Sequence, residues 1–401
     1  MPDSDPLPVI PSSAAPTALL AAPPDPPDPP ATIPSCAPSC APSDLDREIR
    51  IGPCHVSVRI RAGAAGRIAR NELSRALRGL GARRFLVLGE DSARPGQQAE
   101  APDAALGEVL AEVLAALSAA DAPVLLLRRR PGAGPCHPAP AVGTVVVAVG
   151  GSRLLRAAAR SAGAAPLVLV PTTLAAMCDA AVSVRWDADG GCLRAPALVW
   201  SRPGLLRAQP PERAGLYPLL RNVLAVCPYH FDSVAARLRA DGRYAPTTLA
   251  AFVALCADAR STVLDDDPLA RGRGAVLEYG APLARSVGGA PGTGLLATAR
   301  LAERLGLLDA AGRRAHRELL TRAGLAGELP HGDATARPGA LDLVLLDALG
   351  QPHCTAGSLL TRVGAADLRA VLTPAVPVAA DGGTPVIPLT RVTMPAALAV
   401  G

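Results

Sequence analysis

Short runs of valine and leucine alternate with amphipathic stretches between residues 49 and 201, and this alternation limits the folds open to the chain. The runs have the length of buried strands, and the stretches between them carry leucine and alanine at helical spacing. We expect strands at 55–60, 83–91, 123–129, 143–151 and 166–173, and helices at 70–80, 105–120 and 152–162. Near-continuous apolar strands alternating with helices are typical of a parallel sheet covered on both faces.

The pattern changes near residue 202, beyond which apolar residues follow helical spacing. We expect helices at 211–226, 231–240, 248–264, 292–306 and 313–324, and one strand or helix at 341–349. Residues 1–44 are rich in Pro, Ala, Ser and Asp and cannot bury enough apolar surface to offset the entropy of ordering. The sequence therefore predicts a disordered tail at 1–44, an α/β domain at 45–201, and a mostly helical domain with an irregular end at 202–401.

Composition excludes several classes of function. All 40 basic residues are arginine, so a role that needs a titratable ammonium must be filled by a guanidinium or left empty. The net charge is +5, and its one dense run, 128–130, lacks interleaved aromatics for base stacking, so we expect no nucleic-acid partner. No apolar run approaches the roughly 18 residues of a membrane span, and no secretory signal is indicated. We expect a soluble, cytoplasmic protein that does not bind a membrane.

Nine cysteines and six histidines invite a search for a metal site. Cysteine and histidine are adjacent at Cys54–His55, Cys136–His137 and His353–Cys354. None of these pairs gives the ligand spacing of a zinc site, and neighbours on a strand point to opposite faces. Scattered reduced thiols are the expected interpretation.

Four stretches together resemble the sugar-phosphate cyclases, the family of dehydroquinate synthase and 2-deoxy-scyllo-inosose synthase. They are Val170–Arg185, Leu198–Glu212, Arg213–Pro228 and Asp265–Gly280, and the last three are similar to the 2-deoxy-scyllo-inosose synthase branch. The resemblance implies a dehydroquinate synthase-like fold, with a Rossmann-like nucleotide-binding domain followed by a mostly helical metal-binding domain. It also implies a redox-neutral cycle in which bound NAD and a divalent metal convert a sugar phosphate into a carbocycle.

The positions that hold the metal in this family lack donor atoms here. By the resemblance, one Glu and two His ligands fall at Pro218, Ala281 and Val287, and a further His that acts on the substrate falls at Arg285. Proline, alanine and valine cannot ligate a metal, and a guanidinium is a permanent cation. Pro218 either kinks a helix or begins a new one. His331, in the PHGDA stretch, resembles a displaced ligand but cannot make a site alone. The sequence predicts no metal ligands.

The substrate contacts implied by the family are altered as well. Two of its lysines become Arg185 and Arg221, and Asn222 follows the second. Arginine can hold a phosphate through bidentate contacts, so these three residues are the candidate substrate-binding set. A later Gly-Lys-Asn segment of the family is missing between residues 186 and 197.

The implied NAD site is partly retained. Five residues that match the family pattern are the candidate cofactor-binding set: Gly150, Gly151, Thr172, Thr173 and Asp179. Glycines in such a turn let backbone amides approach a pyrophosphate, although a buried turn also needs glycine for steric reasons. Ser152, Leu155 and Arg156 depart from the pattern, and the preceding Glu-x-x-Lys helix is reduced to residues 131–143.

Selective loss of ligand positions from a readable scaffold favours a catalytically inactive homologue. Such a chain is expected to act as a partner or regulator in aminocyclitol or related secondary metabolism, as a homodimer or as a heterodimer with an active cyclase or another biosynthetic enzyme. The alternatives are an active NAD-dependent cyclase with altered ligands, a small-molecule sensor that uses the cleft between the domains, and a decaying gene whose product folds poorly.

Overall fold

The computed structural model describes residues 44–63, 66–90, 102–119, 122–129, 140–186, 193–208, 213–287, 291–325 and 339–372. The chain from Pro42 onward forms one compact unit. Residues 1–43 of the expected tail, together with Cys136, His137 and His331, lie outside the described residues.

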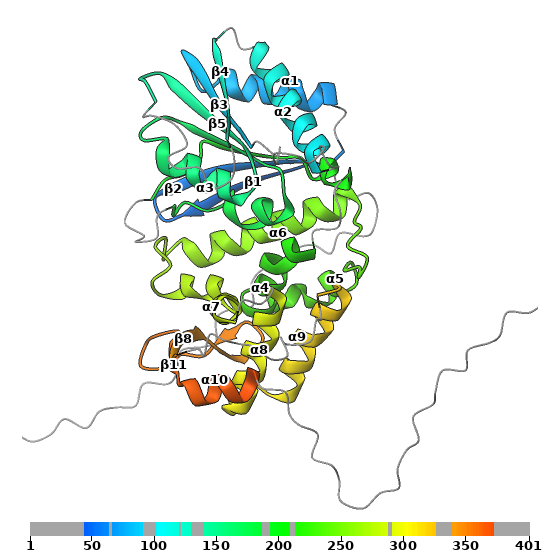
Figure 1. The fold of residues 1–401 in the computed structure, drawn as a ribbon, viewed down its shortest axis with the longest axis vertical. Coiled ribbons are helices and arrows are strands. Elements are labelled where there is room, and N and C mark those ends of the chain that lie inside the picture. The colour runs from blue at the N-terminus through cyan, green and yellow to red at the C-terminus, as the bar shows by residue number, and fades with distance from the viewer. Residues whose placement is uncertain are drawn as a thin grey trace, which may run out of the picture. The chain divides into compact units, whose positions relative to one another are not determined.

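A seven-stranded sheet forms the first half of this unit (Figure 1). Its order is β1-β2-β7-β6-β5-β3-β4, and every neighbouring pair except β1 and β2 is parallel. The strands are β1 (Asp44–Ile51), β2 (Cys54–Arg61), β3 (Arg84–Glu90), β4 (Val124–Arg129), β5 (Thr144–Gly150), β6 (Leu167–Pro171) and β7 (Leu198–Ser201). The predicted α/β fold with a largely parallel sheet is confirmed.

Helices cover both faces of this sheet. The alternation of side chains along a strand sends Phe85 and Val87 into one hydrophobic cluster, with α1 (Gly66–Arg78) and α2 (Pro102–Ser118). Leu86 and Leu88 enter the other cluster, which α3 (Ser152–Ser161) and the second half of the chain complete. The Val/Leu runs of the sequence are therefore continuous because both faces are buried.

Strand β1 was not predicted. It pairs antiparallel with β2 from Asp44↔Arg61 to Ile51↔Cys54, and its inner residues Ile49 and Ile51 are buried. Five of its eight residues are charged between Asp44 and Arg50, so apolar content alone gives no strand signal. The pattern is the alternation of an edge strand with one buried face.

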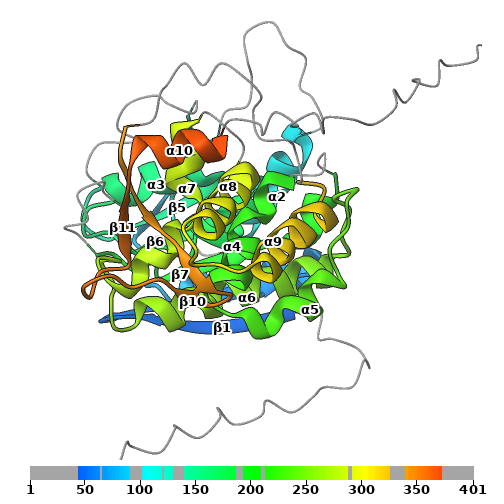
Figure 2. The ribbon, with the colours of Figure 1, turned by 90° about the horizontal axis from the view of Figure 1, so that it is seen from below.

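Helices make up most of the second half. They are α4 (Tyr217–Ala225), α5 (Phe231–Ala235), α6 (Pro246–Leu264), α7 (Ala281–Ser286), α8 (Pro291–Arg304), α9 (Ala310–Arg322) and α10 (Ala365–Leu372). All nine residues of α4 are buried, and the helix contacts α6, α8 and α9 (Figure 2). The expected helix at 231–240 is shorter than predicted, because the chain turns after Ala235.

Pro218 decides where α4 begins. The expected helix at 211–226 is instead a 3₁₀ turn at Arg213–Leu216 followed by α4, with Pro218 in its first turn. Proline lacks an N–H, which the first turn of a helix does not need. Of the two alternatives left by the sequence, the start of a new helix is correct.

Helix α6 joins the two halves of the unit. It packs against β1 and β2 on one side and α4 on the other. Its length and composition would allow it to cross a membrane, but 61% of its apolar window is buried inside the protein. That burial identifies α6 as a core helix.

The region expected to hold one strand or helix at 341–349 contains two short strands, β8 (Leu341–Val344) and β9 (Leu346–Ala348). They pair with β11 (Leu360–Val363) and β10 (Gln351–Pro352) in two separate antiparallel pairs. Leu343, Val344 and Leu346 are buried, which is what their apolar pattern indicates.

Gly294 sets how closely α8 approaches the start of α7. A methyl group there would overlap the Gly280 carbonyl oxygen and lie 2.7 Å from Ala284 Cβ. We expect Gly294→Ala to lower the free energy of unfolding by about 1–3 kcal/mol through overpacking. The matched control is Gly107→Ala in α2, where a methyl group meets nothing within 4 Å. That change should raise stability by about 0.5–1 kcal/mol.

Urea denaturation of both variants checks this prediction. Equal effects of the two substitutions would contradict the close approach of α7 and α8.

Candidate functional site

A pocket of about 460 Å³ lies where α3 and the π-helix η1 (Ala176–Ala180) face α4, α6 and α7. Its volume is in the range of small-molecule sites. Six arginines line it, against two carboxylates, so its wall carries a formal excess of four positive charges. The charged residues are Arg156, Arg160, Arg185, Arg221, Arg260, Arg285, Asp179 and Glu278.

Asp179 is surrounded by guanidinium groups. Its Oδ1 accepts a hydrogen bond from Arg260 Nη2 and lies 3.7 Å from Arg221 Nη2, and its Oδ2 lies 3.2 Å from Arg156 Nη2. Burial alone would raise the pKa of this carboxyl, but the three arginines hold the pKa below its ordinary value. Asp179 is therefore an ionised carboxylate that ties η1 to α3, α4 and α6.

Arg221 is fixed from several sides. Its Nη1 donates to the Leu277 carbonyl at 2.5 Å, and its Nε and Nη2 each lie 3.2 Å from Asn222 Oδ1. The guanidinium carbon is 5.8 Å from the centroid of the Tyr217 ring, a cation–π distance. Asn222 is buried and does not line the pocket, so its role here is to hold Arg221.

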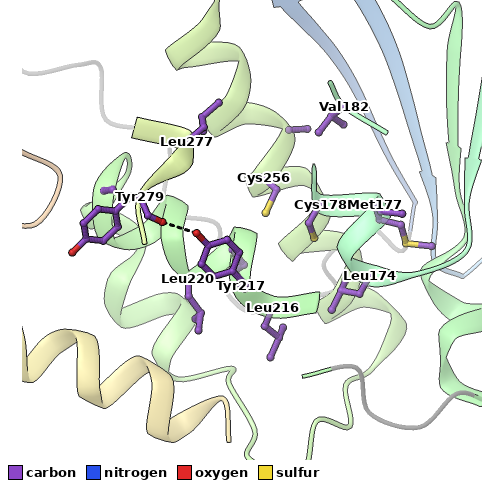
Figure 3. Close-up of a cluster of buried hydrophobic side chains, with 14 of the residues drawn as sticks. Leu174, Met177, Cys178, Val182, Leu216, Tyr217, Leu220, Cys256, Leu277 and Tyr279 are labelled. Carbon is purple, nitrogen blue, oxygen red and sulfur yellow. Dashed lines mark hydrogen bonds between the residues drawn. The ribbon is translucent and has the colours of Figure 1, made fainter. Parts of the chain in front are cut away.

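A hydrophobic cluster forms the floor beneath these charges (Figure 3). In that view Tyr217 lies among Leu216, Leu220 and Cys178, and its hydroxyl donates to the Tyr279 carbonyl at 2.6 Å. Burial raises the pKa of Tyr217 to about 12. The phenol is therefore neutral at physiological pH, and its proton is already committed to a backbone carbonyl.

The other three arginines are held more loosely. Arg185 Nη1 donates to the Leu269 carbonyl at 2.7 Å, and Arg160 Nη1 donates to the Trp186 carbonyl at 3.3 Å. Arg285 reaches Glu278 Oε2 at 3.2 Å with both terminal nitrogens, and both side chains are largely exposed. Each guanidinium has five N–H donors, so these bonds leave donors for a ligand.

Four of the five predicted cofactor-binding residues lie together. Gly150 ends β5, Gly151 precedes α3, and Thr172 and Thr173 follow β6. The Thr172 amide donates to the Gly150 carbonyl at 3.1 Å. Asp179 lies apart from them, in the arginine cluster. Whether any of the five binds NAD stays a prediction.

The turn between β5 and α3 does not fit a dinucleotide pyrophosphate as it stands. Glu90 Oε2 accepts a hydrogen bond from the Gly151 amide at 2.9 Å, so a carboxylate already occupies the start of α3. A methyl group on Gly150 would lie 2.7 Å from Leu154 Cδ2 and 3.0 Å from Glu90 Oε2. Internal packing thus accounts for the glycine, and a second anion here would meet the Glu90 charge.

The residues at the three implied metal positions have no side-chain donor atoms. Pro218 is in the first turn of α4, Ala281 is the first residue of α7, and Val287 follows the end of that helix and packs against the core. Across the described residues, no group of three or more His, Cys, Asp or Glu side chains could hold a metal ion. The pocket wall offers guanidinium groups instead, and a divalent cation does not fit that donor set.

Some site residues were missed by sequence reasoning. The predicted Arg185 and Arg221 do line one pocket, but Arg260 was not singled out, because one arginine in an apolar helix ordinarily indicates a solvated face. The signal available in the sequence was that Cys256 and Val263, one turn before and after Arg260, are apolar, and both are buried in the structure. Glu90 was overlooked because its contact with Gly151 joins residues 61 positions apart.

Comparison with curated proteins finds 2-deoxy-scyllo-inosose synthases. That of Streptoalloteichus tenebrarius is 34% identical over 183 residues, which cover 41% of this chain and 47% of that protein. That of Streptomyces kanamyceticus is 29% identical over 231 residues, 49% of this chain and 59% of that protein. The chain spans about half the length of the curated relatives it matches. No protein-family model matches it.

Solved structures agree on the fold. A 2-deoxy-scyllo-inosose synthase complexed with carbaglucose-6-phosphate, NAD⁺ and Co²⁺ has a TM-score of 0.67 at 19% identity, covering 82% of this chain and 99% of that one. ValA, a 2-epi-5-epi-valiolone synthase from Streptomyces hygroscopicus with NAD⁺ and Zn²⁺ bound, has a TM-score of 0.57 at 18% identity, covering 79% and 95%. The chain is similar in sequence to 2-deoxy-scyllo-inosose synthases and shares the fold of these sugar-phosphate cyclases. The resemblance and the dehydroquinate synthase-like fold inferred from the sequence are confirmed.

The Asp179 cluster gives a direct test of this geometry. Asp179→Asn leaves Arg260 and Arg221 buried without their counter-charge, and we expect it to lower the free energy of unfolding by about 3–5 kcal/mol. Asp342→Asn, which removes an exposed pair with Arg362, is the control and should cost below about 1 kcal/mol. Chemical denaturation measures both. If both variants lose less than about 1 kcal/mol of unfolding free energy, the Asp179 cluster is exposed to solvent and not buried.

Below the pocket floor, His316 is fully buried and bonded at both ring nitrogens. Its Nε2 lies 2.8 Å from the Tyr279 hydroxyl, and its Nδ1 lies 2.8 Å from the Gly312 carbonyl. The carbonyl can only accept, so Nδ1 carries the proton and Nε2 accepts from the tyrosine. Burial lowers the pKa of His316 to about 4.

This lowered pKa predicts a pH dependence of stability. Between pH of about 4 and 6.5 the unfolded chain binds a proton at residue 316 that the folded chain does not, so stability rises with pH across that window. The contribution amounts to about 3 kcal/mol. We expect His316→Gln to remove this part of the rise, as measured by urea denaturation at several pH values. An unchanged pH profile would contradict the buried neutral imidazole.

Proposed function

We propose that this chain is a cytoplasmic sugar-phosphate cyclase homologue without cyclase activity, and that it acts as a binding partner or regulator in aminocyclitol or related secondary metabolism. The observation that carries the proposal is the charge of the pocket. Six guanidinium groups line it, and the positions that correspond to metal ligands hold Pro218, Ala281 and Val287.

The chemistry of the related synthases explains why this matters. A divalent metal stabilises developing negative charge on reacting oxygens as a Lewis acid with open coordination positions. A guanidinium can donate hydrogen bonds to an anion, but it has no empty orbital and does not release a proton near neutral pH. The guanidinium groups of this pocket are therefore suited to bind and orient an anion, and its two carboxylates, Asp179 and Glu278, are both bonded to arginine side chains.

The groups expected to contact NAD also favour an inactive homologue. The Gly151 amide is bonded to Glu90, and Asp179 is bonded to arginines, so two of the groups expected to contact NAD are already engaged. We propose that the chain does not use NAD in a hydride-transfer cycle. The curated relatives are 2-deoxy-scyllo-inosose synthases, which is the support for a role near aminocyclitol formation.

A turnover assay tests the proposal. The purified chain is incubated with glucose 6-phosphate and NAD, with and without Co²⁺ or Zn²⁺, and released phosphate is measured beside an active 2-deoxy-scyllo-inosose synthase. We expect no phosphate release above the enzyme-free background under any condition. Metal-dependent release would overturn the proposal in favour of the alternative, an active cyclase with altered ligands.

We also propose that the chain forms a homodimer or pairs with an active cyclase. Light scattering of the chain alone, and after co-expression with a cyclase from the same host, separates these two assemblies. A monomer in both experiments would contradict both of these pairings.

A further inference from the structure

The pocket holds more positive charge than its own carboxylates neutralise. Glu278 lies near Arg285 at the exposed rim, and Asp179 is shared among three arginines. Arg221 and Arg260 are buried, and burying like charges together is costly unless an opposite charge accompanies them. The same imbalance acts on Arg260, whose pKa is lowered by burial and by Arg221, although it stays charged at neutral pH.

The arginines come from two sides of the pocket. Arg156 and Arg160 are four residues apart on α3 and so share one helix face, and Arg185 follows η1. On the other side, Arg221 belongs to α4, Arg260 to α6 and Arg285 to α7. A ligand in the pocket therefore meets guanidinium groups on opposite walls.

The guanidinium groups that line the pocket are suited to oxyanions. The planar guanidinium fork binds a phosphate or carboxylate through two parallel hydrogen bonds. Two linked phosphoryl groups carry about three to four negative charges near neutral pH, since the second pKa of a phosphate ester is about 6. That charge matches the excess of four on the pocket wall, whereas a dicarboxylate supplies only about two.

We infer that this pocket is a metal-independent receptor for a small anion with two phosphoryl groups, such as pyrophosphate or a bisphosphate, held between the arginines of α3 and those of α4, α6 and α7. The inference rests on the proposed function, because both place anion binding, and not metal chemistry, at this site. The inference adds the class of ligand and the residues that bind the ligand.

Calorimetry of the full chain with inorganic pyrophosphate tests the inference. Pyrophosphate is titrated with and without EDTA, and inorganic phosphate, succinate and NAD are titrated for comparison. We expect pyrophosphate to bind equally with and without EDTA, at least tenfold more tightly than phosphate or succinate. A requirement for a divalent metal, or equal binding of succinate, would overturn the inference. Tighter binding of NAD than of pyrophosphate would also overturn it, because the pocket would then serve a dinucleotide.

Two variants place the ligand in this pocket. Arg160→Gln and Arg185→Gln remove guanidinium groups that the Asp179 cluster does not use, and each should weaken pyrophosphate binding about tenfold. Arg362→Gln, on β11, removes an exposed pair with Asp342 outside the pocket and should bind like the parent chain. Equal affinities for all three variants would place any bound anion elsewhere. Thermal unfolding of each variant confirms that it is folded.

The two proposals fail in different ways. Cyclase turnover accompanied by metal-independent pyrophosphate binding would overturn the proposed function and support the receptor. Absence of both turnover and binding would overturn the receptor and support the inactive homologue.

Discussion

One carboxylate organises the charged centre of this molecule. Asp179, on a π-helical turn after β6, contacts guanidinium groups from α3, α4 and α6. Without it, three arginines would lie together beside a hydrophobic floor with nothing to offset their repulsion. Because it bonds at once to α3, which packs on the sheet, and to α4 and α6 of the second half, it fixes how the two halves of the compact unit meet around the pocket.

The arginines also change what kind of site this is. A catalytic metal ion acts as a Lewis acid that accepts electron pairs, whereas guanidinium groups only donate hydrogen bonds. A wall of such donors is pre-organised by Asn222, Asp179 and backbone carbonyls, so little side-chain freedom is lost when an anion binds. The pocket is thus better suited to hold an anion than to polarise a reacting oxygen.

Much of the fold could be predicted from the sequence, because strands that are buried on both faces of a sheet appear as continuous apolar runs. The valine run of β5 and the leucine run of β4 gave the parallel sheet, and Pro218 marked a helix start. Strand β1 escaped detection because an edge strand with a charged face lacks an apolar run. The expected helix at 231–240 failed because local spacing does not report where tertiary contacts end a helix.

The site was less accessible to prediction. Arg185 and Arg221 were placed together by the family resemblance, but their grouping with Arg260 depends on how α6 lies against α4, which sequence spacing does not encode. The contact between Glu90 and Gly151 is likewise a product of sheet order, since β3 and β5 are neighbours only in space. The retained glycines indicated a nucleotide-binding turn, but in the fold the Glu90 carboxylate is bonded to the Gly151 amide at that turn.

Pro218 restricts what its position can be exchanged for. It begins the most buried helix of the second half, so exchanging it for glutamate would remove the helix start and add an acid beside a packed interior in one step. The packing around α4 therefore depends on a residue without a ligand atom in its side chain, and a carboxylate could take its place only at a cost in stability.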